Sequence, residues 1–100
     1  MKELLVTCKN EGEARKIALA TVSGRLAACV NYWPVKSIYR WRGKVFRERE
    51  WMLSLKTTTK KAAALNKKIR ALHSYELPAI IVLSGRASKQ VEHWIAESTR

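Results

Sequence analysis

The feature that most constrains the fold is a pair of alternating segments that meet at Arg42-Gly43. Residues 35–41 and 44–58 are rich in the β-branched and aromatic residues that are typical of strands. A glycine after a polar residue between two such segments indicates a β-hairpin, although less strongly than Asn-Gly does. The sequence therefore predicts one long antiparallel hairpin, with arms of about ten residues or roughly 33 Å each.

The period of two assigns the side chains of this hairpin to two faces. On the outgoing arm Tyr39 and Trp41 share one face, and Ile38, Arg40 and Arg42 share the other. On the return arm, the face with an apolar base and a charged tip carries Val45, Arg47, Arg49, Trp51, Leu53 and Leu55. A domain of this length has a radius of gyration of only about 13 Å. We therefore expect the aromatic part of the hairpin to pack against another copy of the chain.

Interleaved arginine and aromatic residues, as found over residues 36–50, are also typical of surfaces that stack single-stranded nucleic acid. Ferredoxin-like RNA-recognition domains carry the motif Lys/Arg-Gly-Phe/Tyr-Gly/Ala-Phe-Val-x-Phe/Tyr on a central strand. The segment RGKVFRER shares only the first two positions, and Phe46 is the only phenylalanine in the chain. We therefore expect no sequence-specific nucleic-acid site.

The first third of the chain predicts a strand, a helix and a second strand. Residues 3–8 form a short apolar segment that is typical of a buried strand. A helix then begins at Asn10, and its apolar residues recur at helical spacing until Gly24 ends it. Residues 26–33 predict the second strand, and Pro34 favours an edge position or a bulge there.

The second half of the chain predicts two more helices on either side of one strand. Threonines 57–59 cap a helix whose apolar residues recur three or four apart, namely Ala62, Leu65, Ile69 and Leu72. Residues 77–83 predict the last strand, and Ser88 begins a short helix. We therefore expect a single α+β domain over residues 1–100, with the ferredoxin-like order β-α-β-β-α-β, a long central hairpin and a C-terminal helix.

Twenty Lys and Arg residues against eight Glu residues give the chain a formal net charge of +12. The excess is spread evenly, because residues 1–50 and 51–100 each carry +6. Such a field attracts polyanions in a salt-dependent manner, and it also suits an acidic protein partner. A solvated, highly soluble surface is the simpler explanation, and both stay open at this point.

The residues that catalysis would need are sparse. The chain has two histidines, no aspartate and no Gly-x-Ser-x-Gly sequence around a serine nucleophile. Its four glycines are scattered and form no phosphate-binding loop. Glu48 and Glu50 offer paired carboxylates, but the arginines beside them favour surface salt bridges. We therefore expect no enzymatic activity.

Soft or borderline metal ligands are also few: Cys8, Cys29, His73 and His93. No two of them have the close spacing of a zinc or haem motif. Cys29 lies in an apolar segment and is typical of a small buried residue. His73 ends the second predicted helix, where a histidine suits the negative end of the helix dipole. The spacing therefore predicts no required cofactor.

The N-terminal and apolar segments favour a cytoplasmic protein. The first apolar segment is too short for a signal peptide. The longest apolar run, residues 78–83, is far shorter than the roughly 18 residues of a membrane helix. In a reducing compartment the two cysteines would remain free thiols. We expect a cytoplasmic location and no membrane partner.

Five segments occur in an order and at separations that are specific in combination. They are RLAACVN, SIYRWRGKV, LKTT, IRALHSYELPAIIVL and HWIAEST. Together these segments resemble the CutA family of divalent-cation tolerance proteins. The similarity extends over essentially the whole chain, from Leu4 to Thr99.

The resemblance implies a ferredoxin-like protomer in a tight homotrimer, whose long hairpins pack edge to edge between subunits. It also implies a role in tolerance to copper and other divalent metals, without an established enzymatic activity. The metal-associated positions of the family fall on Cys29 and His73, with copper or another divalent cation as the ligand. The other motif positions are Tyr39, Trp41 and Gly43 in the hairpin at the trimer interface, and Lys56, Tyr75 and Trp94 in a motif pocket.

The chain departs from the family on its surface. The return arm of the hairpin is normally acidic in the family and is KVFRERE here. Ala79 stands where an acidic residue is usual, and fewer carboxylates attract divalent cations less strongly. Two origins therefore stay open: a divergent natural member, or an engineered cationic trimer that serves as a scaffold or docks a partner.

Overall fold

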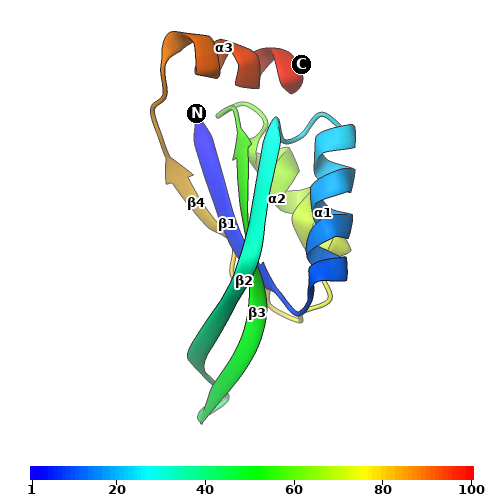
Figure 1. Ribbon diagram of the computed structural model, residues 1–100, viewed down its shortest axis with the longest axis vertical. Coiled ribbons are helices and arrows are strands. Elements are labelled where there is room, and N and C mark those ends of the chain that lie inside the picture. Colours follow the sequence, from blue (N-terminus) through cyan, green and yellow to red (C-terminus); the bar gives the residue numbers. More distant parts are fainter.

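The computed structural model describes residues 1–100 and is shown in Figure 1. Its elements are, in chain order, β1 (Lys2–Cys8), α1 (Glu11–Ser23), β2 (Cys29–Trp41), β3 (Lys44–Thr57), α2 (Ala62–Leu72), β4 (Ile81–Ser84) and α3 (Lys89–Ser98). The four strands form one antiparallel sheet in the order β2-β3-β1-β4. This arrangement confirms the predicted α+β fold and its ferredoxin-like order of elements.

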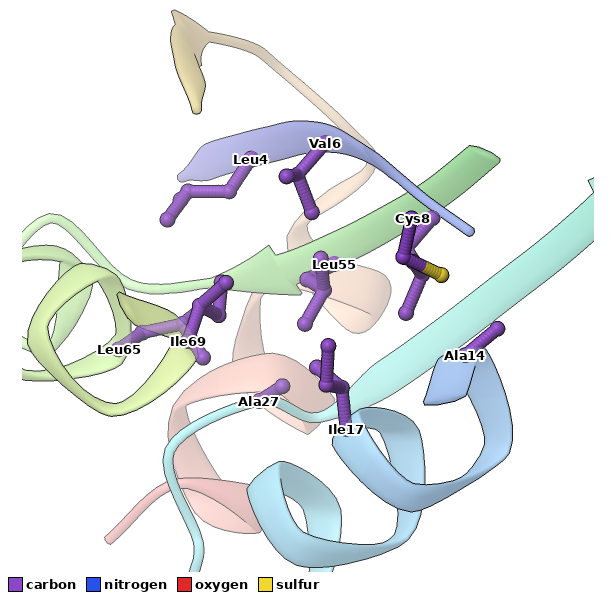
Figure 2. Close-up of a cluster of buried hydrophobic side chains, with 10 residues drawn as sticks. Leu4, Val6, Cys8, Ala14, Ile17, Ala27, Leu55, Leu65 and Ile69 are labelled. Carbon is purple, nitrogen blue, oxygen red and sulfur yellow. The ribbon is translucent and has the colours of Figure 1, made fainter. Parts of the chain in front are cut away.

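The hydrophobic core lies between one face of the sheet and the two helices α1 and α2 (Figure 2). Leu4 from β1 and Leu55 from β3 lie opposite each other in the sheet. They contribute to one buried cluster with Ile17 of α1 and with Leu65 and Ile69 of α2. Each buried aliphatic side chain contributes roughly 1.5–3 kcal/mol to stability. The other face, called the open face below, carries neither α1 nor α2.

The helix termini follow the predicted caps in α1 and α3. Asn10 Oδ1 and Ser88 Oγ each accept a hydrogen bond from the backbone N–H three residues on, at 2.8 and 3.3 Å. At α2 the predicted threonine cap acts one turn early, because Thr58 Oγ1 accepts from the Lys61 N–H at 3.2 Å in the turn before the helix. None of the three helices is long and apolar enough to cross a membrane.

Two strands differ from their predicted bounds. The second strand begins at Cys29 instead of residue 26, because the amides of residues 26 and 27 donate to Thr21 O at the end of α1. The last strand is limited to Ile81–Ser84, and Pro78 has no N–H to donate to a ladder. β4 forms the second edge of the sheet, and its apolar side chains are exposed.

β2 and β3 form the predicted hairpin, with 13 and 14 residues. The two strands pair along their whole length, and Figure 1 shows that the hairpin projects past α1 and α2. Arg42 and Gly43 form the turn with φ values of 50° and 78°, as a type I′ turn requires. The arms are longer than predicted because β2 passes through Pro34 without interruption, as an edge strand allows.

Candidate functional site

A groove of about 960 Å³ lies between the hairpin and the segment of residues 75–80. Tyr39, Trp41 and Glu50 line it from the hairpin, and Tyr75 lines it from the facing segment. The three hairpin residues point to the same side, because alternate residues of β2 and β3 share a face and Tyr39 pairs with Phe46. This side continues the open face of the sheet. The groove therefore joins Tyr39, Trp41 and Tyr75, which the family resemblance assigned, with Glu50, which was expected only to form a surface salt bridge.

The tip of the hairpin is tied to the facing segment through Arg42. Its guanidinium donates two hydrogen bonds to the Glu76 carboxylate, at 2.8 and 3.1 Å. The same guanidinium lies 5.3 Å from the centre of the Trp41 ring. The Arg42–Glu76 ion pair is exposed, and exposed ion pairs contribute little to stability. These contacts link the turn to the facing segment.

Glu50 is the least expected residue of the groove. The residue is only 5% exposed, and the Tyr75 hydroxyl donates a 2.6 Å hydrogen bond to its Oε2. Burial raises the pKa of Tyr75 above its usual range, and the bond to Glu50 raises it further. The expected surface salt bridge at Glu48 and Glu50 is therefore wrong for Glu50, which forms no ion pair. Only one pattern in the sequence could have indicated that Glu50 lies in the groove. This pattern is the alternation of β3, which places Glu50 on the same side as Tyr39.

His73 packs against the ring of Tyr75, and its side chain is fully buried. The backbone N–H of Tyr75 donates to its Nδ1 at 3.0 Å, so Nδ1 carries a lone pair. Its Nε2 lies 2.8 Å from the Thr7 carbonyl oxygen and therefore donates to it. Both ring nitrogens have protein partners, and this bonding attaches the chain after α2 to the end of β1.

Glu13 completes the buried polar cluster below the groove. Its side chain is 8% exposed, its Oε1 lies 3.4 Å from His73 Nδ1, and that oxygen accepts no hydrogen bond. Burial, with a further contribution from Glu13, raises the pKa of the neighbouring Cys8 thiol to about 11. Cys8 is therefore a thiol at neutral pH and lacks the thiolate that nucleophilic chemistry requires.

A second polar group lies on the open face at the other end of the sheet. Lys56 Nζ donates to Asn31 Oδ1 at 2.5 Å, and Cys29 is the cross-strand partner of Lys56. Cys29 is a free, partly exposed thiol. The prediction of a buried Cys29 is therefore wrong, because β2 is an edge strand and Cys29 points to the open face. The buried thiol is Cys8.

Comparison with known proteins decides the family of this chain. The model of the family described as "CutA1 divalent ion tolerance protein" matches residues 3–98. The chain belongs to the CutA1 family. A divalent-cation tolerance protein CutA from Thermus thermophilus is 42% identical over 98 residues, which cover 96% of this chain and 95% of that protein.

Solved CutA structures have the same fold as this chain. The CutA of Archaeoglobus fulgidus, described as a periplasmic divalent cation tolerance protein, has a TM-score of 0.96 at 33% identity, with 100% of both chains covered. A CutA from Nostoc, described as PII-like, has a TM-score of 0.95 at 32% identity and covers 100% of this chain and 98% of that one. The predicted relationship to CutA is therefore confirmed.

The two metal-associated positions that the CutA resemblance assigned do not meet within one chain. Cys29 shares a cross-strand row with Lys56 and Glu3, whereas His73 binds the carbonyl of Thr7. Glu3 and Thr7 are four residues apart on β1, or roughly 13 Å. No group of three His, Cys, Asp or Glu side chains lies close enough to hold a metal ion. The donors within a single copy of this chain therefore do not form a closed metal site.

The three residues assigned to a CutA motif pocket lie in three places. Tyr75 lines the groove, Lys56 lies near the end of β3, and Trp94 is exposed on α3 at the end of the sheet opposite the hairpin (Figure 1). The hairpin assignments Tyr39, Trp41 and Gly43 do lie together, at the tip. The groove, the free Cys29 thiol and the uncovered sheet face are therefore separate features of one chain. Lys56, Tyr75 and Trp94 could form a common pocket only between different copies of the chain.

Proposed function

We propose that this CutA1-family chain acts as a homotrimeric, non-enzymatic protein of divalent-cation tolerance in the cytoplasm. The names of its relatives support the tolerance role. Assembly is supported by one observation, which is the apolar character of the open face. The number of three copies follows the resemblance to the family.

The open face carries large apolar side chains that no part of the chain covers. Trp33 on β2 and Ile81 and Leu83 on β4 point to it and are exposed. An antiparallel sheet with one face in water normally alternates apolar and polar residues, with the polar ones outward. Trp33 and the β4 residues lie at opposite edges of the sheet, and between them Met52 beside Trp33 and Leu5 beside Ile81 are partly exposed on the same face. Exposed apolar surface of this kind marks an interaction site. Another copy of the chain, with the same open face and the same groove, is the simplest cover.

Light scattering on the purified protein tests this assembly. The proposal predicts a mass of about three times the 11.5 kDa of one chain, maintained at micromolar concentration. A stable monomer at that concentration would overturn it. The tolerance role itself does not depend on this result, because it is supported by the family relationship.

For the metal we propose copper, in the monovalent form that a thiolate prefers, or a divalent cation as a ligand, with no cofactor required for folding. Cys29 is the more available of the two assigned positions, because its thiol is free whereas both ring nitrogens of His73 have protein partners. Thiolate sulfur is a soft ligand that selects copper(I). His73 would first have to release either the Thr7 carbonyl or the Tyr75 amide. We therefore expect Cys29 to contribute more to copper binding than His73.

Calorimetric titration with copper(I) under anaerobic conditions tests this assignment. Cys29→Ala should weaken binding strongly and His73→Ala less so, while His93→Ala, at an exposed histidine of α3, serves as the matched control. Melting temperatures show whether His73→Ala remains folded. Equal binding by all four proteins would remove Cys29 and His73 from the copper site.

A further inference from the structure

The hairpin carries a row of basic side chains on the face opposite Tyr39 and Trp41, and two residues of this face, Lys36 and Ile38, also border the groove. This cationic face consists of Lys36, Arg40, Arg47 and Arg49, all exposed. Ile38 and Val45 lie among them and are 74% and 57% exposed. The face projects beyond α1 and α2 (Figure 1), so no helix covers it.

None of the four basic side chains has an acidic partner. The five ion pairs of the chain involve other residues. Lys36 and Arg49 are directly opposite each other in the sheet, and like charges in that position destabilise a hairpin. The two carboxylates of the same hairpin, Glu48 and Glu50, point to the groove side instead. The hairpin therefore concentrates positive charge on one face, at a cost to its own stability.

The average linear density of this charge is similar to that of one DNA strand, although Lys36 and Arg49 lie side by side at the same level. The cationic face extends over five residues of each strand, which are four steps or roughly 14 Å, with the strands roughly 4.8 Å apart. Four positive charges over that length average one per roughly 3.4 Å, which is the axial spacing of phosphates along one strand of B-DNA. Three of the four are arginines, whose planar guanidinium binds phosphate through two parallel hydrogen bonds.

We propose that the cationic face of the hairpin binds the phosphate backbone of double-stranded DNA without sequence preference. A two-stranded β-ribbon fits the major groove of B-DNA, which is about 12 Å wide. The major groove of RNA duplexes is deep and narrow and excludes such a ribbon. Single strands would require stacking aromatic residues, and Tyr39 and Trp41 point to the opposite side. An acidic protein could replace DNA only if its negative charges were as closely spaced along one line as phosphates are. A DNA duplex has this charge density along its whole length.

This DNA-binding surface does not depend on the tolerance role or on the metal. It is also compatible with the proposed trimer, because assembly covers the open face and the groove side of the hairpin. A trimer would present three cationic faces. Evidence against the proposed tolerance role would therefore not count against DNA binding, and evidence against DNA binding would not count against the tolerance role.

Fluorescence anisotropy with a short mixed-sequence DNA duplex tests the proposal over a range of salt. If the four basic residues each neutralise one phosphate, affinity should fall roughly 150-fold between about 50 and 200 mM NaCl. Arg47→Ala/Arg49→Ala should bind more weakly at low salt, and its affinity should fall only roughly 12-fold over the same range. Two duplexes of unrelated sequence should bind equally.

Lys67→Ala/Lys68→Ala is the matched control, because it removes the same charge from exposed positions on α2. It should keep the salt dependence of the unmodified protein. Melting temperature and mass confirm that both variants remain folded, and loss of Arg49 relieves its repulsion with Lys36. Equal losses in the two variants would show attraction by the overall charge only and would overturn the proposal.

Competition experiments separate duplex DNA from other polyanions. Duplex RNA and polyglutamate of equal charge should compete poorly with the DNA duplex. Polyglutamate that competes as well as DNA would overturn the proposal in favour of an acidic protein partner. Duplex RNA that competes equally would contradict the fit to the B-form groove.

Discussion

The two faces of the β2–β3 hairpin share one backbone and have opposite chemistry. The groove side carries Tyr39, Trp41 and Phe46 together with both carboxylates of the hairpin, and Glu50 is buried there under Tyr75. The other side carries Lys36 and three arginines without an acidic partner. Apart from Arg42 in the turn, the groove side carries one cation, Lys44 opposite Trp41. The net charge of +12 is therefore divided unevenly between the two faces of this hairpin.

This contrast indicates that the two faces serve different neighbours. Exposed aromatic residues beside a buried carboxylate suit a protein surface that excludes water. A face of unpaired cations suits a polyanion that stays hydrated. The alternation of a strand makes both possible within the same residues, because it separates neighbours in sequence onto opposite sides.

The largest effect is expected from the aromatic side. Tyr39→Ala/Trp41→Ala should dissociate the assembly, because loss of a buried aromatic side chain costs roughly 3 kcal/mol or more. This free energy corresponds to an increase of roughly 100-fold or more in the dissociation constant of the assembly. Light scattering at increasing dilution measures the change. Arg47→Ala/Arg49→Ala, on the other side of the same strands, should keep its mass. Equal dissociation in both would remove the distinction between the faces.

An intermediate effect is expected from Tyr75→Phe, which leaves the Glu50 carboxylate buried without its donor. Hydrogen bonds to charged groups contribute roughly 1.5–3 kcal/mol, and we expect a loss of unfolding free energy in that range by denaturant titration. Tyr39→Phe is the matched control, because Tyr39 interacts with the exposed Glu48. It should change stability much less. A similar loss in both variants would contradict a special role for the buried pair.

The same pair predicts a dependence on alkaline pH. The pKa of Tyr75 is raised in the folded chain relative to 10.0, so the folded state retains its proton where the unfolded state has lost it. Stability from this group is fully present below pH 10 and decreases as the pH rises above it. Tyr75→Phe should lose less stability than the unmodified protein above pH 10, as measured by melting temperature.

The smallest effect is expected on the cationic face. Lys36→Glu replaces a like-charge pair with an opposite-charge pair across from Arg49 and should stabilise the hairpin by roughly 0.2–1 kcal/mol. Arg40→Glu faces Val45 and should have a smaller effect. Denaturant titration of both variants compares them. A loss of stability in Lys36→Glu would show that Lys36 has a partner in the assembly.

The sequence predicted those features that depend on near neighbours. The turn at Arg42-Gly43 and the caps at Asn10 and Ser88 are local, and the alternation of side chains fixed both faces of the hairpin. The burial of Glu50 depends on Tyr75, which is 25 residues further along the chain. No local pattern in β3 carries that information.

The candidate site was less predictable than the fold for the same reason. Whether Cys29 is buried depends on which strand lies at the edge of the sheet, and the local apolar segment indicated the wrong answer. The engagement of both His73 nitrogens depends on contacts with β1 and with the chain after α2. A histidine at a helix end gives no sign of such contacts in the sequence.

Hydroxyl-radical footprinting of the assembled protein tests the contrast between the two faces most directly. In one chain Tyr39 and Trp41 are each 38% exposed, and Ile38 on the cationic face is 74% exposed. After correction for intrinsic reactivity, Tyr39 and Trp41 should be oxidised far more slowly than their exposure in one chain implies. Ile38 should be oxidised at the rate expected for its exposure. Oxidation of all three in proportion to their exposure in one chain would contradict the account.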